Sequence, residues 1–106
     1  MLHTKIIDTQ KEQIKISDAE QFIASSKFGA NIYFTGTVRN LNDNKEVTVI
    51  TYDSHDEMVI KSFEEIYNET EQKLNIQDKA VFIEHVKGYV KLGEMSIIIA
   101  VACKHR

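Results

Sequence analysis

Apolar and polar residues alternate with the period of a β-strand over several stretches of the chain. The clearest stretch covers residues 29–38, where three apolar side chains alternate with three more polar ones: Ala30, Ile32 and Phe34 against Asn31, Tyr33 and Thr35. Shorter apolar or β-branched runs predict further strands at residues 2–8, 47–52, 80–86 and 95–102. A polar, turn-rich segment at residues 41–45 predicts a loop.

Two segments show the spacing of amphipathic helices. Ser17 and Glu20 match a capping box and predict a short helix to about residue 26. Ser54 and Glu57 match a second capping box, followed to Leu74 by apolar residues at helical spacing. The order β-α-β-β-α-β-β predicts one α+β domain over residues 1–106, with two layers and a mixed or antiparallel sheet that carries the helices on one face.

Composition restricts the possible classes of protein. The chain is 42% hydrophobic and 27% charged, values that are typical of a soluble globular domain. It contains no apolar run that could span a membrane and no signal-peptide pattern. A net charge of −3 argues against nucleic-acid binding, and a single cysteine fits a cytoplasmic protein.

Cationic residues follow two of the predicted strands. Arg39 comes after the strand at residues 29–38, and His105 and Arg106 come after the last strand. A guanidinium group matches phosphate or carboxylate, so the two strand ends predict one anion-binding site at an edge of the sheet. The alternatives are an arginine in a surface ion pair and a solvated chain end. Gly36 is either a bulge position that serves such a site or a glycine that only relieves twist.

Cys103 has two interpretations. The cations that follow it would favour the thiolate and a sulfur-carrying role. It also continues an apolar strand, where a cysteine is usually a small buried side chain. The four histidines lack the spacing of metal ligands, and no phosphate-binding glycine loop or dinucleotide fingerprint is present, so neither a metal nor a cofactor is predicted.

These motifs occur in an order that resembles one family. The matching residues are Gly29-Ala30, Phe34-Thr35-Gly36-Thr37-Val38-Arg39-Asn40, Thr51-Tyr52, Met58, Ile83-Glu84-His85, Gly88, Leu92-Gly93-Glu94 and His105-Arg106. Over about residues 29–106 the chain resembles the large, catalytic subunit of molybdopterin synthase. The segments around Arg39 and His105-Arg106 are the most specific part of this resemblance.

The resemblance implies an α/β hammerhead-type fold and a homodimer within a heterotetramer. Each large subunit would bind a small ubiquitin-like sulfur carrier that ends in a thiocarboxylate. The enzyme would transfer sulfur to cyclic pyranopterin monophosphate and form molybdopterin, without a metal and without a cysteine of its own as sulfur donor. The implied substrate-binding residues, with contributions across the dimer, are Thr37, Val38, Arg39, His105 and Arg106.

The chain departs from the family pattern at two places. Val86 stands where the family usually has arginine. The family also continues beyond its His-Arg pair into a helix and a lysine-bearing segment, so its catalytic lysines would lie beyond Arg106. Three alternatives therefore stay open: a carrier-binding or dimerising relative without catalysis, a sulfurtransferase that depends on Cys103, and a regulatory domain for a small ligand.

Overall fold

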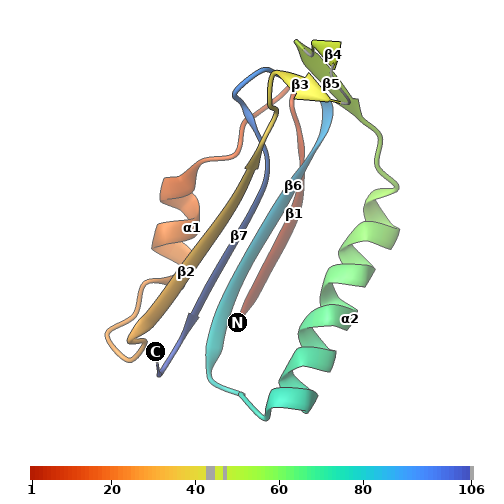
Figure 1. The fold of residues 1–106 in the computed structure, drawn as a ribbon. Coiled ribbons are helices and arrows are strands. Elements are labelled where there is room, and N and C mark those ends of the chain that lie inside the picture. Colours follow the sequence, from red (N-terminus) through yellow and green to blue (C-terminus); the bar gives the residue numbers. More distant parts are fainter. Residues whose placement is uncertain (43–44, 47, 106) are drawn as a thin grey trace.

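Two long neighbouring strands, β6 (Lys79–Lys91) and β7 (Met95–Cys103), form the centre of the sheet (Figure 1). The computed structural model of the protein describes residues 1–42, 45–46 and 48–105. β6 and β7 pair antiparallel, from Lys79 opposite Cys103 to His85 opposite Ile97. Both strands are rich in apolar and β-branched residues, which favour extended backbone. The strands predicted at residues 80–86 and 95–102 are therefore confirmed.

The other strands add to this central pair. β1 (Leu2–Asp8) lies parallel to β6, and β2 (Ala30–Thr37) lies antiparallel to β7, so the order is β1-β6-β7-β2. β5 (Val49–Tyr52) pairs antiparallel with the C-terminal part of β6, from Gly88 to Lys91. The mixed sheet agrees with the prediction. In place of a simple loop at residues 41–45, β3 (Leu41–Asn42) pairs with β4 (Lys45–Glu46), and residues 43 and 44 between them lie outside the described residues.

The cluster of buried residues lies between the sheet and α1 (Ile16–Ile23). Alternate residues of β7 are fully buried on this face, while the residues between them are only half-buried. Ala19 and Ile23 of α1 are buried against this face, and the Phe22 ring lies 5.9 Å from the Phe82 ring. The core cluster on this side includes Ile7, Ile14, Ala19, Ile23, Phe28, Val38, Ala80, Phe82, Val86, Val90, Ile98, Ala100 and Ala102.

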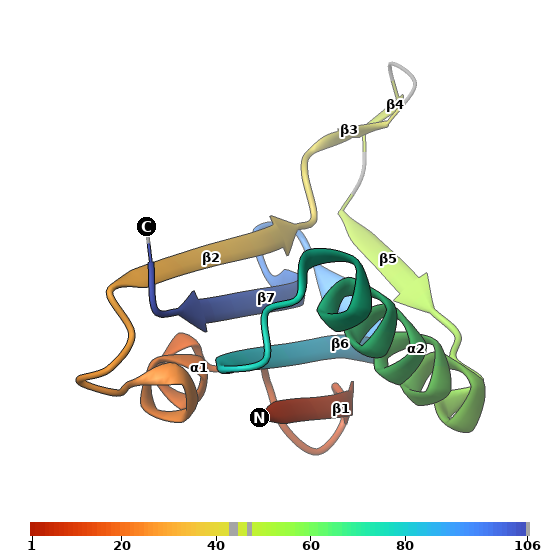
Figure 2. The ribbon, with the colours of Figure 1, turned by 90° about the horizontal axis from the view of Figure 1, so that it is seen from below.

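The α+β class is confirmed, but the expectation that both helices share one face of the sheet is wrong. α2 (Asp56–Leu74) lies on the side of the sheet opposite α1 (Figure 2). On β6, Phe82 contacts α1, whereas the odd-numbered Lys79 and Lys87 contact α2. The physical reason lies in β6. Its first six residues are all buried, although successive side chains point to opposite faces of the sheet. Both faces of this strand must therefore pack against other elements, α1 on one side and α2 on the other.

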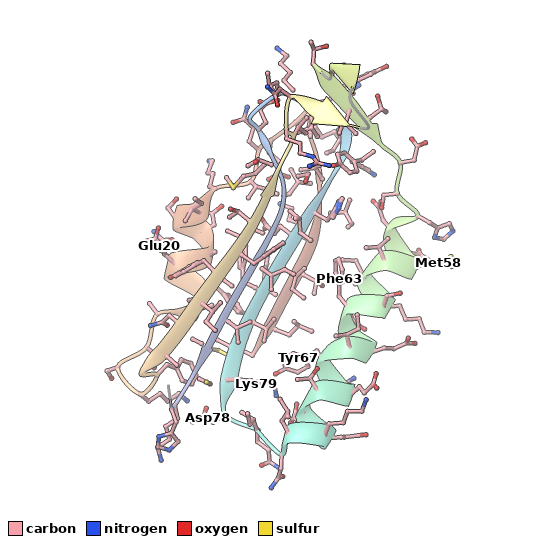
Figure 3. The ribbon with its side chains drawn as sticks, viewed as in Figure 1. Glu20, Met58, Phe63, Tyr67, Asp78 and Lys79 are labelled. Atoms are coloured by element: carbon pink, nitrogen blue, oxygen red, sulfur yellow. The ribbon has the colours of Figure 1, made fainter. Side chains whose placement is uncertain are left out.

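Polar contacts at both ends hold α2 to β6. Near its first turn, Lys87 Nζ donates to Asp56 Oδ2 at 2.8 Å. Near its last turn, the buried Lys79 lies 3.1 Å from Glu71 and 4.4 Å from the centre of the Tyr67 ring (Figure 3). None of the described residues of α2 is fully buried. The helix therefore depends on these ionic and cation–π contacts more than α1 does.

Neither predicted capping box caps its helix. The N-cap of α1 is Lys15 and that of α2 is His55, and neither makes a side-chain capping hydrogen bond. The predicted starts were displaced by one or two residues, the usual uncertainty of a helix boundary. The left-handed Asn75 follows the last turn of α2. Among the described residues, no helix combines the length and the apolar character that crossing a membrane requires.

The first prediction concerns Gly88, where β6 changes its neighbour from β1 to β5. Its φ is +100°, and an added Cβ would lie 2.5 Å from Thr9 Oγ1. Gly88→Ala should therefore lower the free energy of unfolding by about 1–3 kcal/mol, measured by urea denaturation. Gly93→Ala is the control, because its φ of +83° is also strained but a Cβ would meet nothing within 4 Å. Equal losses in the two variants would contradict the steric argument.

The second prediction concerns the bond between Lys87 and Asp56. This hydrogen bond holds the pKa of Asp56 below its usual value and raises the pKa of Lys87. The bond therefore stabilises the fold above about pH 4, and this contribution is lost as pH falls through the lowered pKa of Asp56. At alkaline pH, the same contribution to stability is lost as pH rises through the raised pKa of Lys87.

Lys87→Met should return the pKa of Asp56 toward its usual value, measured by NMR titration of the side-chain carboxyl carbon. The stability difference from the original chain should be largest between about pH 4 and 10. The control is Lys61→Met, which alters an exposed lysine of α2, the helix that also carries Asp56. It should leave the titration of Asp56 unchanged. A low pKa that persisted in Lys87→Met would refute the assigned cause.

Candidate functional site

Arg39 extends from a well-anchored end of β2. The preceding residue, Val38, belongs to the buried core and makes two backbone hydrogen bonds to the loop between β6 and β7. Its N–H donates to the Glu94 carbonyl at 3.1 Å, and its carbonyl accepts from the Gly93 N–H at 2.8 Å. Arg39 itself is exposed, as is Thr37. The fold therefore presents a permanent cation to solvent from a fixed segment of backbone.

Gly36 allows the backbone to approach β7 closely. The pairing of β2 with β7 shifts register between Gly36 and Thr37, which is the mark of a β-bulge. A Cβ at Gly36 would lie 2.8 Å from Cγ2 of Ile97, too close without a shift of that side chain. The glycine thus sets the path of the chain just before Arg39. This agrees with the bulge interpretation of Gly36 without assigning it a ligand.

His105 follows the end of β7 at the opposite end of the sheet. The backbone carbonyl of Lys104 accepts a hydrogen bond from the Gly29 N–H at 3.2 Å, which ties this end of the chain to the start of β2. The His105 side chain is exposed. Arg106, predicted to act with it, lies outside the described residues.

The prediction that the two cationic strand ends form one site within the chain is wrong. β2 and β7 are antiparallel, with Thr37 opposite Met95 and Ala30 opposite Cys103. Arg39 therefore lies beyond one end of this strand pair and His105 beyond the other, as Figure 1 shows for the top of β2 and the C-terminus. At ~3.4 Å per residue the strand pair separates them by roughly 25 Å. A single phosphate cannot bridge that span.

Cys103 is half-buried at the last position of β7. Its Sγ donates to the His105 carbonyl oxygen at 3.3 Å. On β7 the neighbouring residues point alternately to the two faces of the sheet, so Cys103 shares its face with Val101 and not with Ala102. The hydrogen bond and the partial burial agree with the structural interpretation of this thiol.

Two of the other histidines, His3 and His85, have local partners. Nε2 of His3 lies 2.8 Å from Oε2 of Glu84, and the His3 ring stacks on Phe82 at 4.4 Å. Nδ1 of His85 lies 2.8 Å from the Val86 carbonyl, and its ring meets Tyr52 edge-on. Within residues 1–42, 45–46 and 48–105, no three His, Cys, Asp or Glu side chains gather as metal ligands would.

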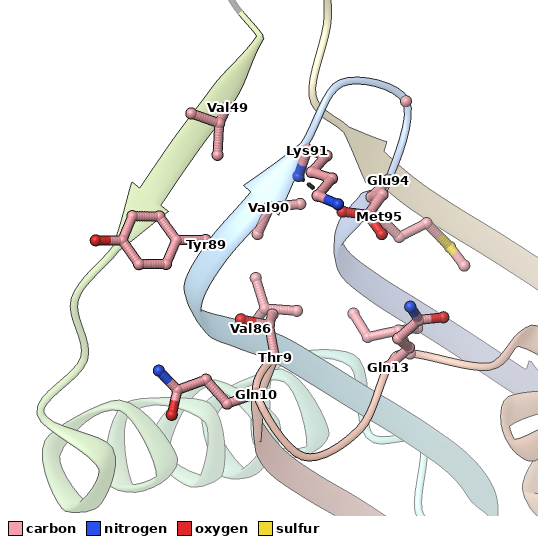
Figure 4. A pocket seen from close by; sticks show the side chains of 12 residues that line it. Thr9, Gln10, Gln13, Val49, Val86, Tyr89, Val90, Lys91, Glu94 and Met95 are labelled. Carbon is pink, nitrogen blue, oxygen red and sulfur yellow. Dashed lines mark hydrogen bonds between the residues drawn. The ribbon is translucent and has the colours of Figure 1, made fainter.

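A pocket of about 630 Å³ opens beside the junction of β5 and β6 (Figure 4). Sequence periodicity gave no sign of it, because its lining combines separate segments: Thr9, Gln10, Gln13, Ile14, Val49, Val86, Tyr89, Val90, Lys91, Gly93, Glu94 and Met95. Val86 is a buried apolar part of this lining. Thr37, Val38, Arg39 and His105, the predicted anion-binding residues within the described part of the chain, do not line this pocket.

Comparison with known proteins supports the resemblance seen in the sequence. The profile of the MoaE protein family matches residues 9–106. The chain is 35% identical over 95 residues to the molybdopterin synthase catalytic subunit of Pyrococcus abyssi, covering 90% of this chain and 63% of that protein. The corresponding subunit of Thermoplasma volcanium is 35% identical over 106 residues, covering 100% of this chain and 75% of that protein. For the human subunit the identity is 33%, over 95% of this chain and 53% of that protein.

Solved structures share the fold. A molybdopterin synthase from Staphylococcus aureus aligns with a TM-score of 0.84 at 24% identity, covering 96% of this chain and 71% of that one. A chain from the complex of subunits 1 and 2 of the molybdopterin-converting factor of Helicobacter pylori aligns with a TM-score of 0.69 at 23% identity, covering 97% of this chain and 66% of that one. The curated relatives are longer, and the chain spans about half to three quarters of their length.

Proposed function

The chain belongs to the MoaE protein family, and from this membership we propose that it acts as the catalytic subunit of a molybdopterin synthase. In this proposal, sulfur passes from the thiocarboxylate of a ubiquitin-like carrier to cyclic pyranopterin monophosphate, and the product is molybdopterin. The relatives named as molybdopterin synthase catalytic subunits support this assignment.

The proposed substrate site combines residues of two copies of the chain. Thr37, Val38 and Arg39 of one copy form one side, and His105 and Arg106 of the other copy form the opposite side. The observation that carries this proposal is the antiparallel pairing of β2 and β7, which keeps Arg39 and His105 apart within one chain. In a homodimer, a two-fold axis can place the Arg39 end of one copy beside the His105 end of the other. The two residues can then contribute to one site although they lie far apart within one chain.

The chemistry of these residues suits the phosphate of the substrate. The Arg39 guanidinium can donate two parallel hydrogen bonds to phosphate oxygens, and a ring N–H of His105 can donate another. Val38, anchored to the loop between β6 and β7, restricts the position of Arg39. A phosphate held in this way orients the pterin carbons toward the carrier thiocarboxylate, which lowers the entropic cost of the reaction. The catalytic residues themselves stay unassigned in this chain.

The proposed partner is the small ubiquitin-like subunit, in a heterotetramer that contains two copies of each chain. The Helicobacter structure supports a small-subunit partner, since it is a complex of subunits 1 and 2 of its converting factor. We place the assembly in the cytoplasm. A relative that binds the carrier without catalysis is the main alternative, and sulfur-transfer assays with the carrier would separate the two.

The third prediction tests the phosphate anchor. Arg39→Ala should weaken the binding of cyclic pyranopterin monophosphate about 10- to 100-fold in isothermal titration calorimetry, because a charge-assisted hydrogen bond is lost. The variant should keep its circular dichroism spectrum, since Arg39 is exposed. The affinity of Arg39→Lys should lie between those of the original chain and Arg39→Ala. Lysine keeps the positive charge but lacks the planar guanidinium that donates two parallel hydrogen bonds. Unchanged binding by Arg39→Ala would refute this anchor.

Cys103→Ser is the matched control for the thiol alternative. It should bind the substrate as the original chain does, and it should support sulfur transfer wherever the original chain does. Loss of transfer with retained binding would favour the Cys103-dependent sulfurtransferase.

The fourth prediction tests whether the site is shared between copies. Arg39→Ala and His105→Ala should each bind the substrate weakly, but an equimolar mixture that exchanges subunits should recover binding at roughly one quarter of the sites. In a mixed dimer, one site has lost both residues and the other keeps both. Two differently tagged copies, purified in sequence, establish that exchange has occurred. No recovery after proven exchange would place the residues in separate sites.

A further inference from the structure

The chain passes from β6 to β7 through a tight turn, residues 91–94, which the carboxylate of Glu94 helps to close. Glu94 Oε1 accepts the backbone N–H of Lys91 at 2.7 Å, drawn as a dashed line in Figure 4. The Glu94 N–H donates to the Lys91 carbonyl at 3.0 Å. Gly93, the third residue of the turn, has a φ of +83°, which a type II turn requires at that position. Two hydrogen bonds therefore join Lys91 to Glu94, and one of them depends on a side chain.

The same turn holds both ends of the segment that begins at Arg39. Val38, just before this segment, makes two backbone hydrogen bonds with the turn, one to the Glu94 carbonyl at 3.1 Å and one from the Gly93 N–H at 2.8 Å. Thr48, just after it, accepts a hydrogen bond from another N–H of the turn at 2.9 Å. Between these two points, β3 and β4 extend away from the main sheet (Figure 2). The backbone position of Arg39 therefore depends on the shape of the turn.

We propose that Glu94 is a positioning residue for Arg39. Its carboxylate holds the turn in the shape that anchors Val38, and through Val38 it fixes where the Arg39 guanidinium can lie. Among the described residues, Glu94 is the only one whose side chain bonds to the backbone of this turn. A misplacement of about 1 Å in a binding group can lower a reaction rate about 100-fold, so a small loosening of the turn matters for Arg39. The importance of this position for substrate binding rests on the proposed function.

The sign of the expected effect separates positioning from simple charge. Glu94 is exposed and belongs to the turn bonded to Val38, so its negative charge lies at the same end of the sheet as Arg39. A negative charge there repels phosphate, and its removal alone should strengthen the binding of an anionic substrate. Positioning predicts the reverse for Glu94→Ala, because the turn loses an acceptor. Glu94→Gln removes the charge but keeps an oxygen that can accept the Lys91 N–H.

The first experiment measures the turn itself, by NMR on the 106-residue chain without substrate. Glu94→Ala should raise the hydrogen-exchange rate of the Val38 amide about 3- to 10-fold, the range expected for loss of one hydrogen bond. It should also lower the ¹⁵N order parameter of the Arg39 amide. Glu94→Gln should keep the original values of both. Glu69→Ala is the matched control, because it removes another exposed carboxylate, paired with Lys73 on α2, and should change neither.

The second experiment measures binding of cyclic pyranopterin monophosphate by isothermal titration calorimetry. Glu94→Ala should bind about 3- to 10-fold more weakly than the original chain, and Glu94→Gln should bind at least as tightly. In an Arg39→Ala background, Glu94→Ala should cause no further loss, because Glu94 acts through Arg39. A role in stability alone would give the same loss in both backgrounds. An unchanged exchange rate of the Val38 amide in Glu94→Ala would overturn the proposal.

The exchange measurements need no substrate, so the results separate this proposal from the proposed function. If Glu94→Ala loosens the Val38 amide and the Arg39 backbone while Arg39→Ala leaves substrate binding unchanged, the positioning of Arg39 stands and the phosphate anchor is wrong. If Arg39→Ala weakens binding while Glu94→Ala changes neither exchange nor binding, the anchor stands and the positioning role of Glu94 is wrong.

Discussion

The antiparallel pairing of β2 with β7 is the constraint on which the rest of the site depends. It continues the sheet from the central pair of β6 and β7, and it sets Arg39 and His105 at opposite ends. Because backbone hydrogen bonds fix strand direction, no change of side-chain rotamer can bring these two residues together. A site that needs both cations therefore needs two copies of the chain.

The two faces of the sheet are stabilised in different ways. Toward α1, apolar side chains such as Ile98 and Ala100 are fully buried, so hydrophobic burial dominates. Toward α2, the Lys79 and Lys87 contacts tie the helix to β6, and Ile32 and Phe34 of β2 stay exposed. An exposed apolar strip at a sheet edge is typical of an interaction surface. The face toward α1 thus holds the buried core of the domain, while the apolar side chains of β2 stay accessible to solvent.

Much of the candidate site could be predicted from the sequence, because its signals are local. Gly36 and Arg39 belong to one short segment, and the bulge and the exposed cation both follow from that segment and its neighbours. The family resemblance rested on the same residues. The sequence could not show how far Arg39 lies from His105, since that distance depends on the pairing of β2 with β7, residues more than fifty positions apart. The pocket beside Val86 was missed for the same reason, because its lining comes from separate segments.

By itself the sequence determined where the longer strands and both helices lie, because a period of two or 3.6 residues is a local property of the chain. Its alternating and β-branched runs predicted β1, β2 and β7 to within one residue at each end, and the first part of β6, which runs five residues beyond the predicted end. Only the tertiary structure decided that β1 lies parallel to β6, that α1 and α2 cover opposite faces, and that the two cationic strand ends point apart. These features depend on hydrogen bonds and packing between distant segments, and the pattern of side chains within one segment carries no information about its partner's direction.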